Sequence, residues 1–402
     1  MQQIPLLHKE LEKELPFIHK KRLNCLMTTC NTAATNNALF LTALGRKDPA
    51  KTKTSSNIEK VNRLLGNKHL HAERMAFYQA MAARLMTSSM NPWIHVDWSC
   101  INATTNLYVL RASISATGRS IVLYEECHPK KKENNHSVHK QFLKNLNSIL
   151  PRCGKPVIVA DAGFRAPWFE AVCQMGWDFV GRLRNKNLLL MGGTETWQAS
   201  SRLFEKATEK PTHFGHALLT EKGQVPVHVV LYKGKSKNRH QRNLNKKISA
   251  SGKSKRYSNA AKEPWVLVTS LSVARDNPKH IVNIYRQRMR IEENFRDSKC
   301  PHYGLGLKAS LTRSPERMAI LLLIAAIATF AAWVAGIITT LTGKAMDFQA
   351  HSAKFTRSLS MVYLGREAIK KRLFISKSQF LLALRSLLQM VIATQLEPAV
   401  YD

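Results

Sequence analysis

Acidic residues are scarce in this chain. Only 27 of its 402 residues are Asp or Glu, against 61 Lys or Arg, so the formal net charge is +34. Because 44% of the residues are hydrophobic, the chain can bury real cores, which excludes a histone-like or wholly disordered basic chain. A positive excess spread along the chain predicts a polyanionic partner. Nucleic acid and an acidic membrane surface are the two candidates.

Closely paired cysteines are also missing, and the first residues do not indicate an export signal. The seven cysteines are widely spaced and include no Cys-x-x-Cys pair, which argues against a disulfide scaffold and a zinc ribbon. The first residues, MQQIPLLHKELEKELP, carry acids and a proline where an export signal needs an unbroken apolar stretch, so we expect a cytoplasmic protein. The nearest approach to a metal cluster is Cys127, His128, His136 and His139, and solvated histidines explain that group equally well.

One long hydrophobic run stands out against this polar background. No charged residue lies between Arg317 and Lys344, and the stretch 318–343 is long enough to cross a bilayer as a helix. The run is rich in Ala, Thr and Gly, and a large α/β domain also needs one wholly apolar helix at its centre. We favour this buried core helix, broken near Gly336, over a membrane span.

The N-terminal part, to about residue 85, has apolar residues at helical spacing. A basic loop separates the segment around Leu41 and Leu44 from a second helix, for which Ser55, Ser56 or Asn57 is the expected N-cap. Two short helices around such a loop are compatible with a helix-turn-helix DNA reader, and equally with any small helical domain.

From about residue 92 the pattern changes to strands. The runs WIHVDWS, LYVLRASIS and RSIVLYEE predict three adjacent strands, with a tight hairpin joining the last two. A helix over 134–149 and an apolar strand ending at Asp161 follow. This order predicts a mixed α/β sheet.

A mainly β segment interrupts the alternation between about 184 and 264. Its probable strands are HFGHALLT and VPVHVVLYK, and residues 233–256 then carry ten Lys or Arg and no acid. We interpret this basic run as a phosphate-binding arm, with a solvated loop as the alternative. Strand character resumes at Trp265, and Pro278 opens a long helix predicted to reach residue 299.

Three carboxylates are candidates for metal chemistry on phosphodiesters. Such chemistry commonly uses two Mg²⁺ ions about 4 Å apart, held by carboxylates on rigid elements. Asp97 and Asp161 each lie in or directly after an apolar strand run, although either one alone could be an ordinary strand-end residue. On the long helix, spacing places Glu292 on the stripe of Tyr285 and Lys299, and Glu293 and Asp297 elsewhere, so Glu292 is the better third ligand.

These residues carry a resemblance to a known family. Tyr285, Arg288, Glu292 and Lys299 form the pattern Y-x2-R-x3-E-x6-K, which is similar to the signature of the insertion sequence four family of bacterial DDE transposases. The contexts VDWS, VADAGF and KEPWVLVTSL resemble the insertion sequence ten group within that family, and the resemblance runs over essentially the whole chain.

The resemblance implies a fold and a set of site residues. It implies an α/β, ribonuclease-H-like core with a mainly β insertion, and helical N-terminal and C-terminal regions. Asp97, Asp161 and Glu292 would hold two Mg²⁺ ions, with Mn²⁺ as a substitute. Tyr285, Arg288 and Lys299 would contact DNA phosphates, and Trp265 would stack on a flipped base, although without the resemblance a buried strand tryptophan is the simpler interpretation.

The resemblance also implies a division of the chain and a set of partners. The expected parts are a DNA-binding region, two parts of the core around the insertion, and a C-terminal region for dimer or DNA contacts, with bounds 1–85, 86–183, 184–264, 265–345 and 346–402. The partners would be double-stranded DNA at transposon ends, flanks and targets, and a second copy of the chain, in the bacterial nucleoid and away from membranes.

The activity implied is cut-and-paste transposition through a DNA hairpin. Three alternatives remain open from the residues alone. They are a ribonuclease-H-like nuclease that joins no ends, a DNA-binding protein without catalysis, and a basic membrane protein.

Overall fold

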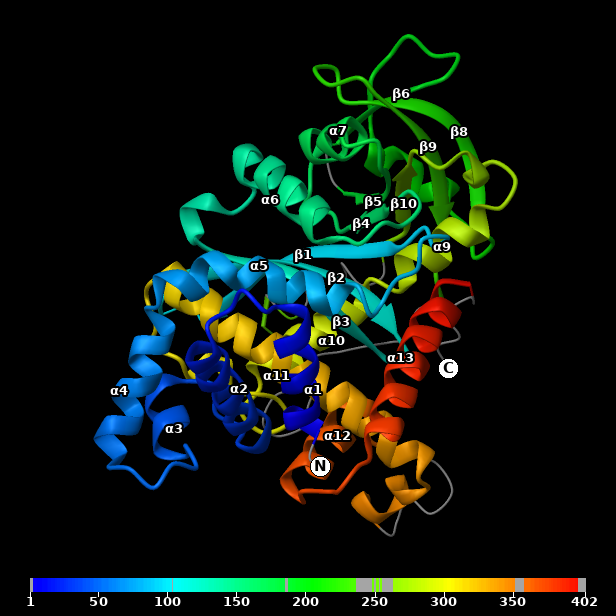
Figure 1. The fold of residues 1–402 in the computed structure, drawn as a ribbon. Helices are drawn as coiled ribbons and strands as arrows, with labels where there is room; N and C mark the ends of the chain where they lie inside the picture. The colour runs from blue at the N-terminus through cyan, green and yellow to red at the C-terminus, as the bar shows by residue number, and fades with distance from the viewer. Residues whose placement is uncertain are drawn as a thin grey trace. The chain divides into compact units, whose positions relative to one another are not determined.

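The computed structural model describes residues 3–102, 104–184, 187–235, 263–350 and 358–396, with 248, 251, 252 and 254. The chain divides into two compact units. Unit 1 comprises Met1–Gly154 and Met289–Glu397, and unit 2 comprises Lys155–Arg288. Helices and strands alternate in the middle of the chain, and helices make up both ends, so the predicted α/β class with helical terminal regions is confirmed (Figure 1).

Unit 1 begins with five helices. These are α1 (Gln3–Glu14), α2 (Lys20–Thr35), α3 (Leu41–Arg46), α4 (Thr54–Leu65) and α5 (Lys68–Ala82). Helix α3 packs against α4, and α5 packs against β3 and α6 further along the chain.

The start of α4 differs from the prediction. The helix begins at Thr54 with Lys53 as its N-cap, so Ser55, Ser56 and Asn57 all lie inside it. Asn57 is buried, and its Oδ1 accepts a hydrogen bond of 2.5 Å from the Thr52 hydroxyl. Hydrogen bonds of this side chain to the loop just before the helix replace the capping role that its residue type suggested.

The three predicted strands form an antiparallel sheet in unit 1. They are β1 (Trp93–Asn102), β2 (Leu107–Ala116) and β3 (Arg119–Pro129), with β2 between its neighbours. Helix α6 (His136–Ile149) follows, close to its predicted range, and packs on β3. The alternating apolar residues of the three runs are what indicated these strands.

The long hydrophobic run forms one continuous helix, α11 (Pro315–Leu341). It packs against α1, α2, α5, β3, α12 (Met361–Lys370) and α13 (Lys377–Leu396), and it lies among these helices in Figure 1. By length and composition α11 and α13 are both long and apolar enough to cross a membrane, but 94% of the most apolar window of α11 is buried inside the protein. In the described structure α11 is therefore a core helix.

The predicted break near Gly336 is wrong. A Cβ atom at Gly336 would lie 2.1 Å from the Met361 carbonyl oxygen, and one at Gly365 only 1.7 Å from the Ala332 carbonyl oxygen. Because neither glycine has a Cβ atom, α11 and α12 can pack closely against each other at these positions. Their role is packing between helices, and Gly336 leaves the helix intact.

In unit 2 the hydrogen-bonded strands follow the order β4-β5-β10-β9-β8-β6-β7, which is part of a larger mixed sheet. Its strands are β4 (Val157–Ala160), β5 (Asp178–Leu183), β6 (Leu188–Met191), β7 (Gln198–Ala199), β8 (Thr212–Leu219), β9 (Val225–Tyr232) and β10 (Trp265–Thr269). Among these described strands the β4–β5 pair is parallel, and the pairs from β5 onward are antiparallel. The mainly β insertion thus extends the edge of a single sheet.

In the described part of unit 2, helices α7 (Ala166–Gln174) and α9 (Pro278–Arg286) accompany the strands. Helix α9 contacts strands β4, β5, β8, β9 and β10 and buries Ile281, Val282 and Ile284. Most of the basic segment 233–256 lies outside the described residues, so its role as a phosphate-binding arm stays a prediction.

Candidate active site

Asp97 lies on β1 of unit 1, on the sheet face that carries a buried ion pair. In the antiparallel register Asp97 is opposite Arg111 on β2, and Arg111 is opposite Glu125 on β3. Residues directly opposite one another point to the same face of a sheet. Arg111 and Glu125 are joined by a salt bridge of 2.7 Å, and both side chains are almost fully buried.

Helix α10 (Met289–Lys299) packs on β1, β2 and β3 at this face. The Arg111 guanidinium lies 4.4 Å from the centre of the Phe295 ring on α10. At the end of α10, Lys299 Nζ donates a hydrogen bond of 2.5 Å to the Ser99 hydroxyl on β1. Ser99 is two residues beyond Asp97 and therefore on the same face, so the structure brings Asp97 and Lys299 together.

The environment of Lys299 is partly apolar. Burial, and next the charge of Arg111, lower the pKa of Lys299 to about 8, while Cys100 and Asp97 oppose the shift. The ammonium remains the major form at neutral pH. Held by Ser99 and by the field of Asp97, it is suited to bind an anionic oxygen.

The three carboxylates of α10 fall on two faces, with Glu293 and Asp297 together and Glu292 apart from them, as helical spacing predicts. Glu293 and Asp297 both pair with Arg119 on β3, at 3.7 Å and 2.8 Å. Ile291 is buried against the sheet. Glu292, in the first turn of the helix, lies on neither of these faces, and its side chain is exposed.

The predicted single helix over 278–299 is wrong, because the chain forms two helices with an interruption at Gln287 and Arg288. The predicted single stripe is wrong with it, since Tyr285 lies on α9 whereas Glu292 and Lys299 lie on α10. The Arg288 N–H bonds the Tyr285 carbonyl oxygen at 3.0 Å, a contact three residues back that tightens the turn. No Gly or Pro marks the position. The two helices pack on different sets of strands, α9 on β4, β5, β8, β9 and β10 and α10 on β1, β2 and β3, and the helical repeat ends between them.

Asp161 in unit 2 directly follows β4, whose four residues are all buried. Asp161 Oδ1 accepts a hydrogen bond of 2.8 Å from the Gly163 N–H. A Cβ atom at Gly163 would lie 3.0 Å from the same oxygen, so a residue without a side chain suits this turn. The turn fixes one oxygen of the carboxylate at the end of a rigid strand.

Tyr285, Arg288 and Trp265 form a second cluster in unit 2. The rings of Trp265 and Tyr285 are 4.9 Å apart at an interplanar angle of 74°. Tyr285 is buried, and burial raises its pKa, against the effects of Arg288 and Arg182, which both hydrogen-bond it. The charge of Asp161 also raises the Tyr285 pKa, so Asp161 lies near this cluster.

Trp265 is only half-buried at the start of β10, and its ring also contacts Tyr232 at 5.6 Å. The simpler interpretation, a buried strand tryptophan, agrees with the strand position, but the side chain is buried only in part. Arg182, whose guanidinium lies 6.0 Å from the Trp265 ring centre, was missed in the sequence. The sequence indicated only that Arg182 lies in a strand. The pairing of β5 with β10 places it near Trp265, and this pairing joins segments far apart in the sequence.

The alternative metal group at Cys127, His128, His136 and His139 does not assemble in the described structure. His128 pairs with Glu126 at 2.8 Å, and His139 accepts a hydrogen bond of 2.9 Å from the Trp98 indole N–H. Within the described ranges, the cluster that could hold a metal through histidine or cysteine lies elsewhere, at His213, His216 and His228.

A mixed α/β protein of high positive charge, with carboxylates on its strands and buried cations beside them, is organised like an enzyme that acts on nucleic acid. The chain matches the family model of the transposase DDE domain over residues 96–330, which is more than half of its length. It therefore belongs to the DDE transposase family. No curated protein sequence matches the chain.

Family membership settles the coarse function. The chain is a DNA-binding transposase, of the class of enzymes that cut and join phosphodiesters, and its α/β fold is the ribonuclease-H-like core of such proteins. The family generally uses divalent metal ions. All seven candidate residues lie inside the matched range, as does the β insertion.

Proposed function

We propose that the protein is a cut-and-paste transposase of the insertion sequence four family, similar to the insertion sequence ten group, and that it acts on the terminal inverted repeats of its own element. The observation that carries the proposal is the transposase match over residues 96–330, which contains the complete Y-x2-R-x3-E-x6-K pattern. The high positive charge supports extensive contacts with DNA phosphates.

Asp97, Asp161 and Glu292 are the proposed metal ligands. Carboxylate oxygens are the donors that Mg²⁺ and Mn²⁺ prefer, so these residues fit a hard divalent cation better than zinc. Two of them are fixed on regular elements, Asp97 within β1 and Glu292 in the first turn of α10, and Asp161 is fixed by its turn after β4. Bound cations would supply Lewis-acid stabilisation of the attacking and leaving oxygens.

The remaining residues position the DNA. Lys299, held at Ser99, provides a localised positive charge beside Asp97 for a non-bridging phosphate oxygen. Arg288 and Tyr285 provide a donor pair near Asp161, and the half-buried Trp265 provides a stacking surface for a base turned out of the duplex.

The proposed reaction consists of four in-line displacements at phosphorus. Water cuts one strand at the transposon end, and the freed 3′-hydroxyl attacks the opposite strand to form a hairpin. A second water opens the hairpin, and the 3′-hydroxyl then attacks target DNA. Each step makes one P–O bond and breaks another, with the proton passing from the attacking oxygen to solvent and a proton going to the leaving oxygen.

The proposed assembly is a homodimer that pairs two transposon ends in the bacterial cytoplasm, at the nucleoid. The five helices α1–α5 are the proposed end-binding region, and the helices after α11 are proposed to contact DNA or the second copy. The division into regions 1–85, 86–183, 184–264, 265–345 and 346–402 remains a prediction about function.

The test is an assay with the flanked terminal repeats of the element, purified protein and Mg²⁺, with products separated on a denaturing gel. We expect nicks, hairpins and joined products. Nicks without hairpins or joining would instead indicate a nuclease, and binding without cleavage under Mg²⁺ or Mn²⁺ would indicate a DNA-binding protein without catalysis.

A further inference from the structure

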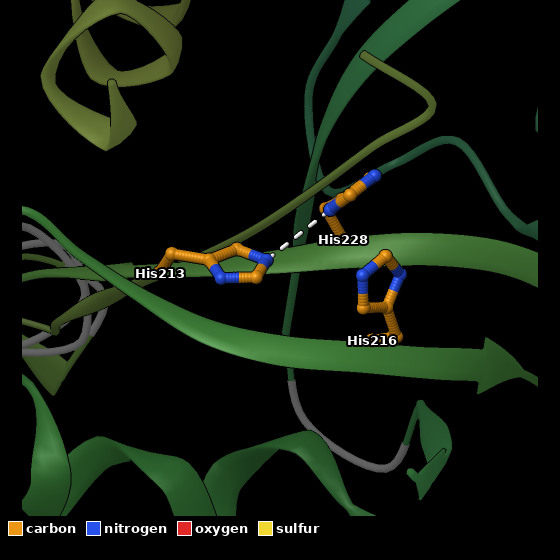
Figure 2. Close-up of side chains that lie close together, drawn as sticks. All are labelled: His213, His216 and His228. Carbon is orange, nitrogen blue, oxygen red and sulfur yellow. Dashed lines mark hydrogen bonds between the residues drawn. The ribbon is translucent and has the colours of Figure 1, made fainter. Parts of the chain in front are cut away.

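Three histidines lie close together in the β insertion of unit 2. His213 and His216 are on β8, and His228 is on the adjacent strand β9. Figure 2 shows the rings of His213 and His228 joined by a hydrogen bond, with His216 beside them. One nitrogen from each of the three rings lies within 4.8 Å of the other two.

A β-bulge brings the three rings together. His216 and His228 are directly opposite in the β8–β9 register. His213 is three residues before His216, and side chains three apart on a regular strand point to opposite faces. The register shifts between His213 and Gly215, and the bulge turns His213 toward the other two rings.

Gly215 makes this bulge possible. Its φ is +123°, a backbone conformation that side chains with a Cβ rarely adopt. The convergence of the histidines therefore depends on a residue that carries no metal-binding group, which offers a test that leaves all three rings in place.

The spacing of the nitrogens matches that of metal ligands. His213 Nε2 and His228 Nδ1 are 3.2 Å apart. Because zinc–nitrogen bonds measure about 2.0–2.1 Å, two nitrogens of a tetrahedral site are separated by about 3.4 Å. The His216 and His228 rings are adjacent as well, with centroids 4.2 Å apart. Small rotations of the side chains would direct all three nitrogens at one ion.

The surroundings keep two of the rings in the form that binds metal. Burial lowers the pKa of His213 and of His228, and the neighbouring His216 ring and Arg275 act in the same direction, so both rings are neutral near pH 7. Asp276 opposes the shift at His213 and contributes a negative charge favourable to a cation. His213 and His228 are half-buried, whereas His216 is exposed and leaves the cluster open to solvent.

We propose that His213, His216 and His228 bind one Zn²⁺ ion, with a water molecule in the fourth position. Three neutral imidazoles favour a borderline transition metal, whereas the carboxylate residues of the active site favour Mg²⁺. The ion joins β8 to β9 and stabilises this strand pair of the insertion. The proposal does not depend on the transposition mechanism, because none of the three histidines belongs to the proposed catalytic set.

The test measures zinc binding by the full-length protein after removal of metal with a chelator. Zn²⁺ is titrated in competition with a chromophoric chelator, and Co²⁺ is used as a spectroscopic probe of tetrahedral nitrogen coordination. We expect His228→Gln and His213→Gln to lose one equivalent of bound zinc, or to bind it at least tenfold more weakly. Exposed His69→Gln on α5 is the matched control and keeps the wild-type stoichiometry.

Two further variants test whether the bound zinc depends on the bulge and whether it is held by the catalytic carboxylates instead. Gly215→Val retains every histidine but removes the bulge, and it should lose the same equivalent. Glu292→Gln should retain it, which separates this ion from any metal held by the catalytic carboxylates. Circular dichroism establishes that each variant is folded.

Equal zinc stoichiometry and affinity in wild type, His213→Gln and His228→Gln would overturn the proposal. So would a Co²⁺ spectrum dominated by thiolate charge transfer that is unchanged in these variants, since the seven cysteines would then account for the binding. Retention of the site in Gly215→Val would show that the bulge is not what assembles it.

Discussion

Lys299 on α10 donates a hydrogen bond of 2.5 Å to Ser99 on β1, two residues beyond Asp97. The bond connects the last residue of the Y-x2-R-x3-E-x6-K pattern to the strand that carries the first carboxylate. Within unit 1, therefore, the last residue of the pattern holds α10 to β1 beside Asp97. A cation on a helix is fixed next to an acid on a strand, although 202 residues separate them along the chain.

Removal of the Lys299 charge should weaken binding to transposon ends. If Lys299 neutralises one phosphate, Lys299→Met should reduce the slope of log affinity against log salt by about 0.9. Ser99→Ala retains the charge and should have a smaller effect. The measurement is fluorescence anisotropy of labelled end DNA over a range of salt, with Lys140→Met on the exposed face of α6 as control. A slope unchanged in Lys299→Met would remove Lys299 from the DNA contacts.

Trp265 should matter for hairpin formation more than for the first nick. Loss of a base-stacking ring costs about 1–3 kcal/mol, which corresponds to roughly 5- to 150-fold in rate if the stacked base is present in the hairpin-forming transition state. Trp265→Ala should therefore accumulate nicked ends, and Trp265→Phe should recover part of the hairpin yield. Quantifying nicks and hairpins over time checks this, and normal hairpin rates in Trp265→Ala would contradict the stacking role.

The contact between α11 and α12 should not tolerate a methyl group. Gly365→Ala places a Cβ against the Ala332 carbonyl, and overpacking of this kind costs typically about 1–3 kcal/mol or more. Gly66→Ala is the control, because its nearest atom is the flexible end of Arg317 at 3.3 Å. Urea unfolding measures both. Equal stability of wild type and Gly365→Ala would mean that α12 does not pack on α11 as described.

Stability should fall in mild acid because of His139. Burial lowers the pKa of His139 to about 4, helped by the charges of His136 and His128. The unfolded chain therefore binds a proton between pH 6.5 and 4 that the folded chain does not, so the free energy of unfolding falls as pH falls through this window. A shift of this size corresponds to about 3 kcal/mol.

The variant His139→Gln removes the titrating ring and should flatten the decline. Its side chain can still accept the hydrogen bond of the Trp98 indole. Unfolding free energies of wild type and variant are compared from neutral pH to about pH 4, with His69→Gln as the histidine control. Parallel curves for wild type and His139→Gln would show that this ring does not carry the acid sensitivity.

Much of the fold was predictable because its signals are local. Alternating or continuous apolar runs located β1–β4, β8–β10 and α6, and the length of the apolar run located α11. The break between α9 and α10 at Gln287 could not be predicted, because no breaker residue is present and the strands that each helix packs on are brought there by long-range pairing. The role of Gly336 was likewise invisible, since its partner Met361 lies far along the chain.

In the candidate sites, too, local patterns located some residues and missed others. Residue types and spacing selected Asp97, Asp161 and Glu292, and helical periodicity separated Glu292 from Glu293 and Asp297. The histidine cluster was missed. His213 and His216 have the wrong spacing for one strand face, and only the bulge at Gly215, which pattern analysis does not locate, brings them together.

The most direct measurement compares Glu292→Gln with Glu293→Gln in the assay with end DNA, Mg²⁺ and a target plasmid. The two variants remove adjacent charges from the same helix, but Glu293 pairs with Arg119 on another face. We predict that Glu292→Gln binds ends with near-normal affinity and forms no nicks, hairpins or joined products, as should Asp97→Asn and Asp161→Asn. Glu293→Gln should retain all three products. Near-normal cleavage by Glu292→Gln would contradict the assignment of the active site.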